Sequence, residues 1–393
     1  MRAVHAARKG EVEYFGVVVN TGSRDETEHE QGLAHFVEHT IFKGTKKRRS
    51  WHIINRMESI GGELNAYTTK EETVVYTVFP RGALSRAAEL VSDLICESVF
   101  PESELEKERD VVSDEISSYL DTPSEAIFDD FDENIFAGSP MAHNILGTSS
   151  NLALFTPQVC RSWLDRRYTP ASMVVFYSGP SSAKRLFEIV EKNFGRLNHD
   201  MAANNRQIPL VNPVFDITLD KGLHQCHTIA GARIAGLLDN HRHAFSLLVN
   251  MIGGPGMNSL LNFELREKRG LVYTVDASSA LYSDCGLITV YYGCDYTDEE
   301  KCRELLCSTL CRLYDTVTAN VLDRAKKQFI GQLALSRQNF ENVAISAGRH
   351  TLFHGSALTP AQIDERIRSV SLDDFRHSLS CVLPENLSFL TFR

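Results

Sequence analysis

Two histidines and a glutamate lie close enough in the sequence to form a zinc hydrolase site. They are His35, Glu38 and His39, in the pattern H-x-x-E-H, which is the inverse of the commoner H-E-x-x-H. On a helix, residues four positions apart share a face, so both imidazoles can reach one metal ion. Glu38 lies beside them and can take a proton from water. We therefore predict a helix over 32–42 carrying two zinc ligands and a general base; the alternative is a polar surface helix.

A third zinc ligand is expected from the acidic segment 105–116. If this segment is helical, its apolar face contains Leu105, Val112, Ile116 and Tyr119. Glu108 and Glu115 fall on or beside this face, whereas Asp110 and Asp114 fall on the opposite side. A carboxylate turned toward a core is costly unless a metal or cation meets it. We predict Glu115 as the third ligand and Glu108 as a partner that orients a ligand; the alternative is that both pair with Lys or Arg at the rim.

The motif and its spacing resemble the pitrilysin and mitochondrial-processing-peptidase family of inverted-zincin metallopeptidases in its short, two-domain form. Glu115 follows the second histidine of the motif by 76 positions (115 − 39 = 76). Arg266 and Tyr273, seven positions apart (273 − 266 = 7), match a pair that the family's second domain contributes. Further similar segments are the turn at 20–26, the strand at 61–68 and the glycine-rich loop at 253–259.

The resemblance implies a role for each of these residues. One Zn²⁺ per chain would be held by His35, His39 and Glu115. Tyr273 would donate to the developing oxyanion, and Arg266 would hold the substrate or Tyr273 in place. By themselves, these two residues could equally be a core strand residue and part of a solvated helix end.

The same resemblance implies that an extended peptide lies beside the strand around residues 64–67 and adds a strand to the sheet. Asn65 would then hold a substrate carbonyl, and Ala66 would leave room for the peptide backbone. The alternative for both is an ordinary bend after Gly61 and Gly62.

The chain consists of two halves with similar patterns of elements. The matching segments are the strands 14–19 and 227–232, the helices 32–42 and 241–252, the strands 73–79 and 271–276, the helix pairs 84–97/102–119 and 298–315/319–337, and the closing strands 173–177 and 387–391. An ungapped alignment of the helices places Glu115 opposite Gln332, so the second half has no third ligand. It also lacks the H-x-x-E-H motif.

These patterns predict an α+β fold with two homologous sandwich-like halves, each with a mixed or antiparallel sheet and helices packed on one face. A polar segment ending in prolines separates the halves. We predict a catalytic domain at 1–198, a linker at 199–213 and a second domain at 214–393. By resemblance, the halves form a clamshell, and two identical chains enclose a chamber.

Composition narrows the classes of function. The net charge of −10 argues against nucleic-acid binding, which needs a basic face. No apolar stretch approaches the roughly 18 residues of a membrane span, and the first residues lack the apolar core of a secretory signal peptide. Nine scattered cysteines are typical of reduced thiols in the cytoplasm.

Taken together, the residues and the resemblance predict a cytoplasmic zinc endopeptidase, active as a homodimer on peptides or short unfolded segments. The alternative is a non-catalytic structural or partner subunit of the same fold. Such subunits lose parts of the motif or of the Arg and Tyr pair, whereas this chain keeps them all.

Overall fold

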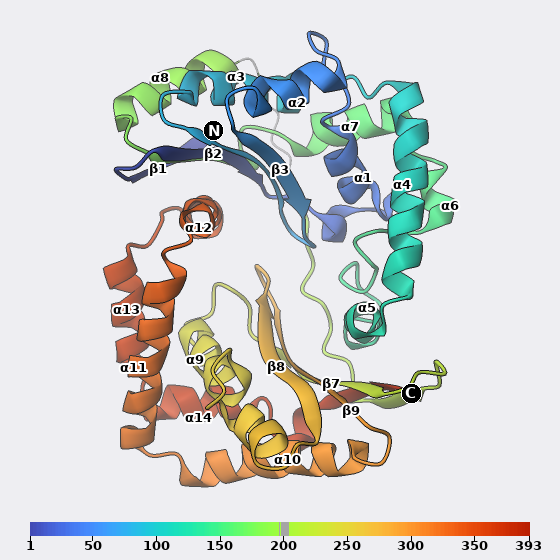
Figure 1. The fold of residues 1–393 in the computed structure, drawn as a ribbon, viewed down its shortest axis with the longest axis vertical. Helices are drawn as coiled ribbons and strands as arrows, with labels where there is room; N and C mark the ends of the chain where they lie inside the picture. The colour runs from blue at the N-terminus through green and yellow to red at the C-terminus, as the bar shows by residue number, and fades with distance from the viewer. Residues whose placement is uncertain (196, 198–203) are drawn as a thin grey trace. The chain divides into compact units, whose positions relative to one another are not determined.

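The computed structural model shown in Figure 1 describes residues 1–195, 197 and 204–393. These residues form two compact units, each assembled from three stretches of the chain. Unit 1 comprises Met1–Ser118, His143–Gln207 and Arg337–Leu358, and unit 2 comprises Tyr119–Ala142, Ile208–Ser336 and Thr359–Arg393. Of the predicted linker 199–213, residues 199–203 lie outside the described residues. Within the described ranges, no helix is both long and apolar enough to cross a membrane.

Unit 1 is built around a five-stranded mixed sheet with the order β1-β5-β2-β4-β3. The β1–β5 pair is parallel, and the other neighbours are antiparallel. The strands are β1 (Arg2–Ala7), β2 (Val12–Val19), β3 (Glu63–Thr68), β4 (Thr73–Pro80) and β5 (Met173–Gly179). Because β3 is at the edge of this sheet, it pairs with β4 on one side and can accept a further strand on the other.

The sheet of unit 1 is buried on both faces. Along β2, Phe15, Val17 and Val19 belong to one apolar core, while Val18 belongs to a second core on the opposite face. This follows from the alternation of side chains along a strand. A continuous apolar sequence such as that of β2 is what a strand covered on both faces requires.

The helices of unit 1 cover the first face and position the acidic and histidine side chains. They are α1 (Leu33–Thr40), α2 (Ser50–Glu58), α3 (Leu84–Glu97), α4 (Glu102–Leu120), α6 (Ser149–Leu152), α7 (Pro157–Arg167) and α8 (Ala183–Phe194), with the 3₁₀ turns η1 (Ser23–Asp25) and η2 (Glu28–Glu30). In α3, the buried residues Leu84, Ala87, Ala88, Val91 and Leu94 recur at the spacing of one helix face. They pack into the first core together with β2.

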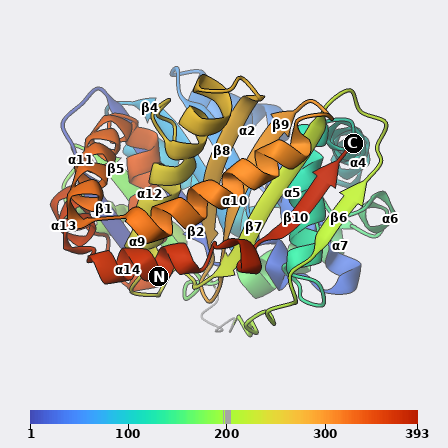
Figure 2. The ribbon, with the colours of Figure 1, turned by 90° about the horizontal axis from the view of Figure 1, so that it is seen from below.

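Unit 2 repeats this architecture. Its sheet has the order β6-β10-β7-β9-β8, so in both units the last strand lies between the first and the second. The strands are β6 (Asp216–Leu219), β7 (Cys226–Ile234), β8 (Val272–Leu281), β9 (Gly286–Cys294) and β10 (Ser388–Phe392). The helices are α9 (Arg242–Gly253), η3 (Asn262–Glu267), α10 (Glu299–Thr316), α11 (Ala319–Ser336), α13 (Pro360–Ser369), α14 (Leu372–Ser380) and η4 (Pro384–Asn386). Figure 2 shows α9, α10 and α14 lying over this sheet.

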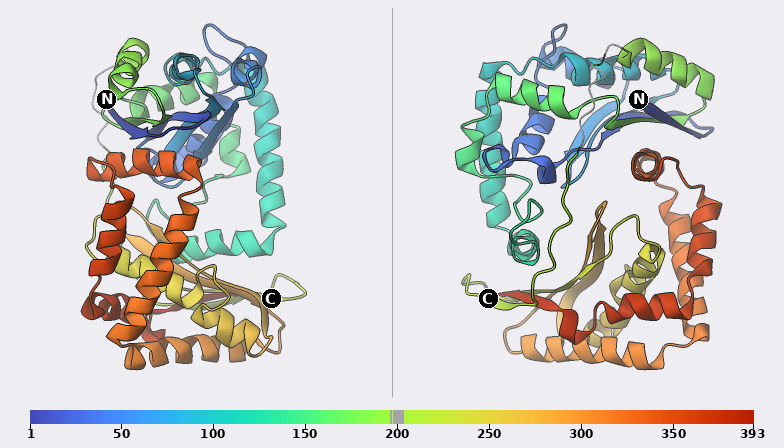
Figure 3. Two further views of the ribbon diagram at one scale, coloured as in Figure 1. Left: turned by 60° about the vertical axis from the view of Figure 1, so that its left-hand side comes forward. Right: turned by 180° about the vertical axis from the view of Figure 1, so that it is seen from behind.

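One helix from each half of the chain belongs to the unit formed mainly by the other half. Helix α12 (Phe340–His354) packs on β1, β2 and β5 of unit 1, and α5 (Pro123–Ile135) packs on β7 and β10 of unit 2. Figure 3 shows both helices from two further sides. Ala344, Ile345 and Leu352 of α12 complete the second core of unit 1. The compact units therefore differ from the division 1–198 and 214–393 in these two exchanged helices.

The two mixed five-stranded sheets confirm the predicted fold class of two similar α+β halves. The prediction that helices cover one face of each sheet is incomplete, because an exchanged helix covers the second face. The reason is the apolar character of that face, where Val18, Val74, Val174 and Phe176 would otherwise meet water.

The contact between α12 and the sheet of unit 1 can be tested at Gly348. A Cβ there would lie 2.8 Å from a Val18 methyl and 3.0 Å from the Phe176 ring. We expect Gly348→Ala to lower the free energy of unfolding by about 1–3 kcal/mol through overpacking. The control is Gly331→Ala in α11, where a Cβ has no neighbour within 4 Å and where alanine stabilises a helix by roughly 0.5–1 kcal/mol. Urea denaturation curves showing equal effects for the two variants would contradict this packing.

Candidate metal centre

A buried carboxylate holds the start of α1. Gly32 is the N-cap residue of the helix and has φ 95°, a left-handed conformation suited to glycine. Because glycine has no side chain, the N-cap residue cannot itself accept hydrogen bonds from the first N–H groups of the helix. Glu26 supplies the missing acceptors: its Oε2 accepts from Gly32 N at 2.9 Å, and its Oε1 accepts from Ala34 N at 2.7 Å. His143 Nε2 lies 2.9 Å from the same Oε2. The helix is therefore fixed at its first turn, which contains His35.

The Glu26 carboxyl is strongly desolvated by its surroundings. Burial raises its pKa to about 7, against the lowering effect of His143 and the two backbone N–H groups. These contacts also explain why the turn at 20–26 matters, since it brings Glu26 under the helix. The turn belongs to the family pattern, but no sequence signal indicates the contacts of Glu26 and His143 with the helix.

The structure brings together the three residues predicted as zinc ligands. One ligand atom from each of His35, His39 and Glu115 lies within 4.8 Å of the others. Glu115 Oε2, on α4, is 3.8 Å from His35 Nε2 and 3.5 Å from His39 Nε2. Two imidazole nitrogens converging on a carboxylate oxygen form a donor set that suits zinc. The Glu115 side chain is 43% exposed, so the cluster can be reached from solvent.

The two histidines have different environments. Burial, together with the neighbouring His39, lowers the pKa of His35 to about 3, so its imidazole is neutral as a metal ligand must be. The hydrogen bond to Glu108 raises the pKa of His39. In that bond, His39 Nδ1 is 3.3 Å from Glu108 Oε2. Because a carboxylate accepts, this contact favours the neutral tautomer with its proton on Nδ1, in which Nε2 can act as a ligand.

As predicted, Glu108 lies next to the ligand candidate His39 and is not itself one of the three residues of the cluster. Its other oxygen is 2.6 Å from Lys43 Nζ. Burial raises the pKa of Glu108, but the hydrogen bonds from His39 and Lys43 outweigh it and hold that pKa below its usual value. Lys43 was not predicted, since one lysine in a basic stretch has no periodicity that points to a partner.

Glu38 lies one turn after His35 on α1. Among the described residues, none donates a hydrogen bond to its carboxylate. Burial raises its pKa to about 7; the charge of His39 opposes this and that of Glu115 adds to it. A carboxyl group with a pKa near neutrality can both accept and return a proton at physiological pH. On the opposite side of α4, Asp110 and Asp114 are exposed, as the helical periodicity predicted.

Asn65 and Ala66 lie on β3, the edge strand that packs beside α1. They pair with Tyr76 and Val75 of β4. They are therefore strand residues, and the alternative of a simple bend after Gly62 is wrong. The free edge of β3 lies in the unit that carries the histidine cluster.

Arg266 and Tyr273 lie in unit 2, on η3 and β8. The register of β8 against β9 shifts between Val272 and Thr274, so Tyr273 is the extra residue of a β-bulge. Its side chain is 85% exposed, which excludes a core role. The Arg266 guanidinium lies 5.7 Å from the centroid of the tyrosine ring. Both residues line a cavity of about 200 Å³ together with Pro255, Met257, Asn262 and Asp276.

Comparison with known proteins identifies the family. Residues 3–149 match the family model "Insulinase (Peptidase family M16)", and residues 155–329 match "Peptidase M16 inactive domain". The chain is 32% identical to an uncharacterized zinc protease of Bacillus subtilis, over 91% of this chain and 87% of that protein.

The chain belongs to peptidase family M16. Another relative, an uncharacterized zinc protease of Mycobacterium tuberculosis, is 32% identical over 96% of this chain and 87% of its own length. The solved structure of a protease from Helicobacter pylori has the same fold, with a TM-score of 0.89, 20% identity and coverage of 100% and 96%. His35, His39 and Glu115 all fall within the first M16 match.

The third ligand can be tested by comparing two neighbouring acids on α4. Glu115→Gln should weaken zinc binding by more than the roughly 10–100-fold that loss of an outer partner costs. Asp114→Asn should leave zinc affinity unchanged, because Asp114 is exposed on the other side of the helix. Competition with a chelator measures both affinities. Equal affinities would remove Glu115 from the ligand set.

Proposed function

We propose that this M16 chain is a zinc-dependent endopeptidase acting on peptides or short unfolded segments. The observation that carries the proposal is the convergence of His35 and His39 of α1 with Glu115 of α4, together with the partly buried carboxyl of Glu38 on α1. The names of its relatives, which include zinc proteases from several bacteria, support the same chemistry.

His35, His39 and Glu115 would hold one zinc ion per chain. When bound, zinc supplies a Lewis acid that makes water acidic near neutral pH and polarises a carbonyl group. Glu108 keeps the proton of His39 on Nδ1, so that Nε2 can act as a ligand. Lys43 in turn holds Glu108 in its charged form.

Glu38 would act as the general base. It takes a proton from the attacking water and returns it to the leaving amine, and a pKa near 7 suits both steps. Glu26 fixes the first turn of the helix that carries Glu38 and both histidines.

The peptide would bind in an extended conformation along the free edge of β3. Main-chain hydrogen bonds of an added strand give affinity for peptides of varied sequence. Asn65 would hold a substrate carbonyl, and the small side chain of Ala66 would let the peptide backbone approach. Arg266 would orient the substrate or Tyr273, and the hydroxyl of Tyr273 would donate to the developing oxyanion.

We further propose that two identical chains assemble into a dimer whose chamber encloses the peptide, as in the short members of the resembled family. The proposed compartment is the cytoplasm, where the nine free cysteines would stay reduced. The competing function is a non-catalytic partner subunit of the same fold, and it predicts zinc binding without turnover.

The role of Glu38 separates these two functions. Glu38→Gln should keep zinc content and fold but abolish peptide hydrolysis, because an amide cannot accept the proton. Zinc content and turnover of a mixed peptide library are measured on the same sample. Glu58→Gln, an exposed residue of α2, makes the same chemical change away from the cluster and should keep full activity. Near-normal turnover of Glu38→Gln, or loss of zinc with activity, would disprove the assignment.

The hydroxyl of Tyr273 can be tested without disturbing its ring. Tyr273→Phe should lower the single-turnover rate by about a hundred- to a thousand-fold, the usual cost of one oxyanion donor, while zinc content stays unchanged. Tyr314→Phe on α10 removes a hydroxyl from another partly exposed tyrosine and should have no effect. An unchanged rate for Tyr273→Phe would leave this exposed tyrosine without a catalytic role.

A further inference from the structure

A surface cavity of about 340 Å³ in unit 1 is lined entirely by side chains that can donate hydrogen bonds. Its lining includes four permanent cations, Lys47, Arg48, Arg56 and Arg86, together with His52 and Asn55. No carboxylate is among the lining residues. The cavity lies at α2, α3 and the loop before α2, and it is strongly basic in a chain whose net charge is −10.

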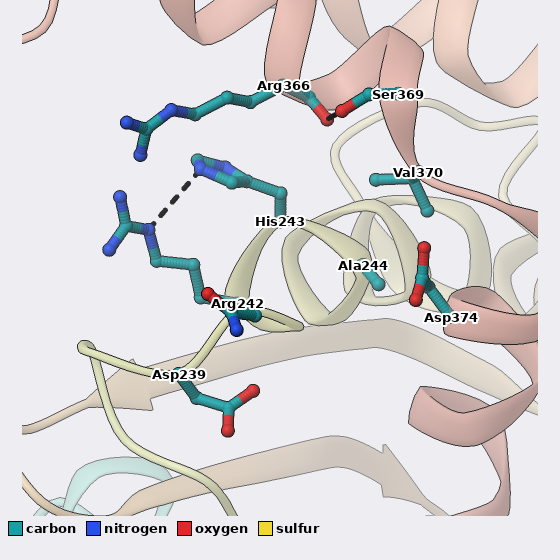
Figure 4. Close-up of a pocket in the computed structure, with 9 residues that line it drawn as sticks. Asp239, Arg242, His243, Ala244, Arg366, Ser369, Val370 and Asp374 are labelled. Atoms are coloured by element: carbon teal, nitrogen blue, oxygen red, sulfur yellow. Dashed lines mark hydrogen bonds between the residues drawn. The ribbon is translucent and has the colours of Figure 1, made fainter.

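A second polar cavity shows how unusual this lining is. It lies in unit 2 at the start of α9 and encloses about 290 Å³. In Figure 4, the side chains of Arg242 and Arg366 run alongside each other, Asp239 lies near Arg242, and Asp374 lies farther away, near Ala244 and Val370. Its two arginines and two carboxylates leave it without formal charge. The cavity in unit 1 has no such balance in its lining.

Two acids beneath the unit 1 cavity neutralise only part of its charge. Glu89 binds both Arg48 and Arg56. Asp93 Oδ2 accepts from Arg48 at 2.5 Å, and Asp93 Oδ1 lies 3.9 Å from Lys47 Nζ. Three of the four cations thus contact two carboxylates and the fourth, Arg86, contacts neither, which leaves a formal excess of two positive charges.

Arg86 contributes most clearly to this excess. Its described hydrogen bond goes to the Arg56 carbonyl, at 3.4 Å. Among the described residues, none of its neighbours forms an ion pair with it. Lys47 has only the distant contact with Asp93, and its side chain is 65% exposed. Both groups can therefore turn to a ligand without breaking a short ion pair.

The loop that carries two of the cations is held rigidly against α3. Thr45 Oγ1 donates to Asp93 Oδ2 at 2.8 Å and accepts from the N–H groups of Lys47 and Arg48 at 3.2 and 3.0 Å. Asp93 itself is buried. A site held in place before the ligand arrives loses less conformational entropy on binding.

We propose that this cavity binds a small, soluble, phosphate-bearing molecule. A phosphate group offers several charged oxygens to donors that approach from different sides, and arginine forks match its geometry. A single carboxylate would leave several of these donors unused. The inference stands whether or not the chain is a peptidase, because it depends on α2, α3 and the loop between α1 and α2, and on none of the predicted catalytic residues.

Inorganic pyrophosphate is a suitable probe, with calorimetry at low ionic strength as the measurement. We expect saturable binding of one pyrophosphate per chain that weakens with added salt. The double variant Lys47→Gln/Arg86→Gln should bind at least about tenfold more weakly, the cost of one charge-assisted hydrogen bond or more. Lys47 is exposed and Arg86 is partly exposed, so the variant should keep the unfolding midpoint of the wild type.

The matched control is Arg81→Gln, an exposed arginine before α3 whose nearest carboxylate is 3.9 Å away. It removes a charge from the same unit and should bind pyrophosphate as the wild type does. Vesicles containing one-fifth phosphatidylglycerol test for a lipid headgroup instead of a soluble ligand. Binding to vesicles alone, no saturable pyrophosphate binding, or equal losses in Arg81→Gln and the double variant would each overturn the proposal.

Discussion

The hydrogen bonds from the first turn of α1 to Glu26 are the contact on which the histidine cluster depends. This helix has only eight residues, too few to be stable by itself in water. Its free N–H groups at Gly32 and Ala34 are satisfied by one buried carboxylate, which His143 supports from the other side. Every side chain of the cluster that comes from α1 takes its position from this anchored turn. The buried carboxyl of Glu26 thus has a structural role, in contrast to the catalytic role proposed for Glu38.

The two units carry complementary features on a common architecture. Unit 1 presents an edge strand beside the histidine cluster, and unit 2 uses a β-bulge to turn Tyr273 out of its sheet. Both features are departures from regular sheet pairing. A regular sheet buries or pairs its groups, so residues that must meet a ligand are found where pairing stops or is interrupted. The two units therefore share a strand order but expose different features, the free edge of β3 in unit 1 and Tyr273 in unit 2.

Local periodicity was enough to predict much of the site and most of the regular elements. The four-residue spacing of His35 and His39, and the placement of Glu108 and Glu115 beside Leu105 and Val112, depend only on helix geometry. Contacts between distant segments were not predictable in this way. Glu26 reaches α1 from a preceding turn, Lys43 follows the helix, and α12 covers a sheet formed more than 150 residues earlier (340 − 179 = 161). The α12 contact is set by the apolar face that it covers, and the other two by polar partners on distant segments, so no single segment contains that information.

The exchange of α5 and α12 makes the two halves of the chain topologically interdependent. A fragment ending before the linker would leave Val18, Val174 and Phe176 uncovered, because α12 would be missing. It would also carry α5 without the strands that bury Phe131 and Ile127. A protease that nicked the connection near residue 205 would therefore produce two fragments that remain interlocked through their cores. Each half of the chain has its own complete sheet, but each needs a helix from the other half to complete its core.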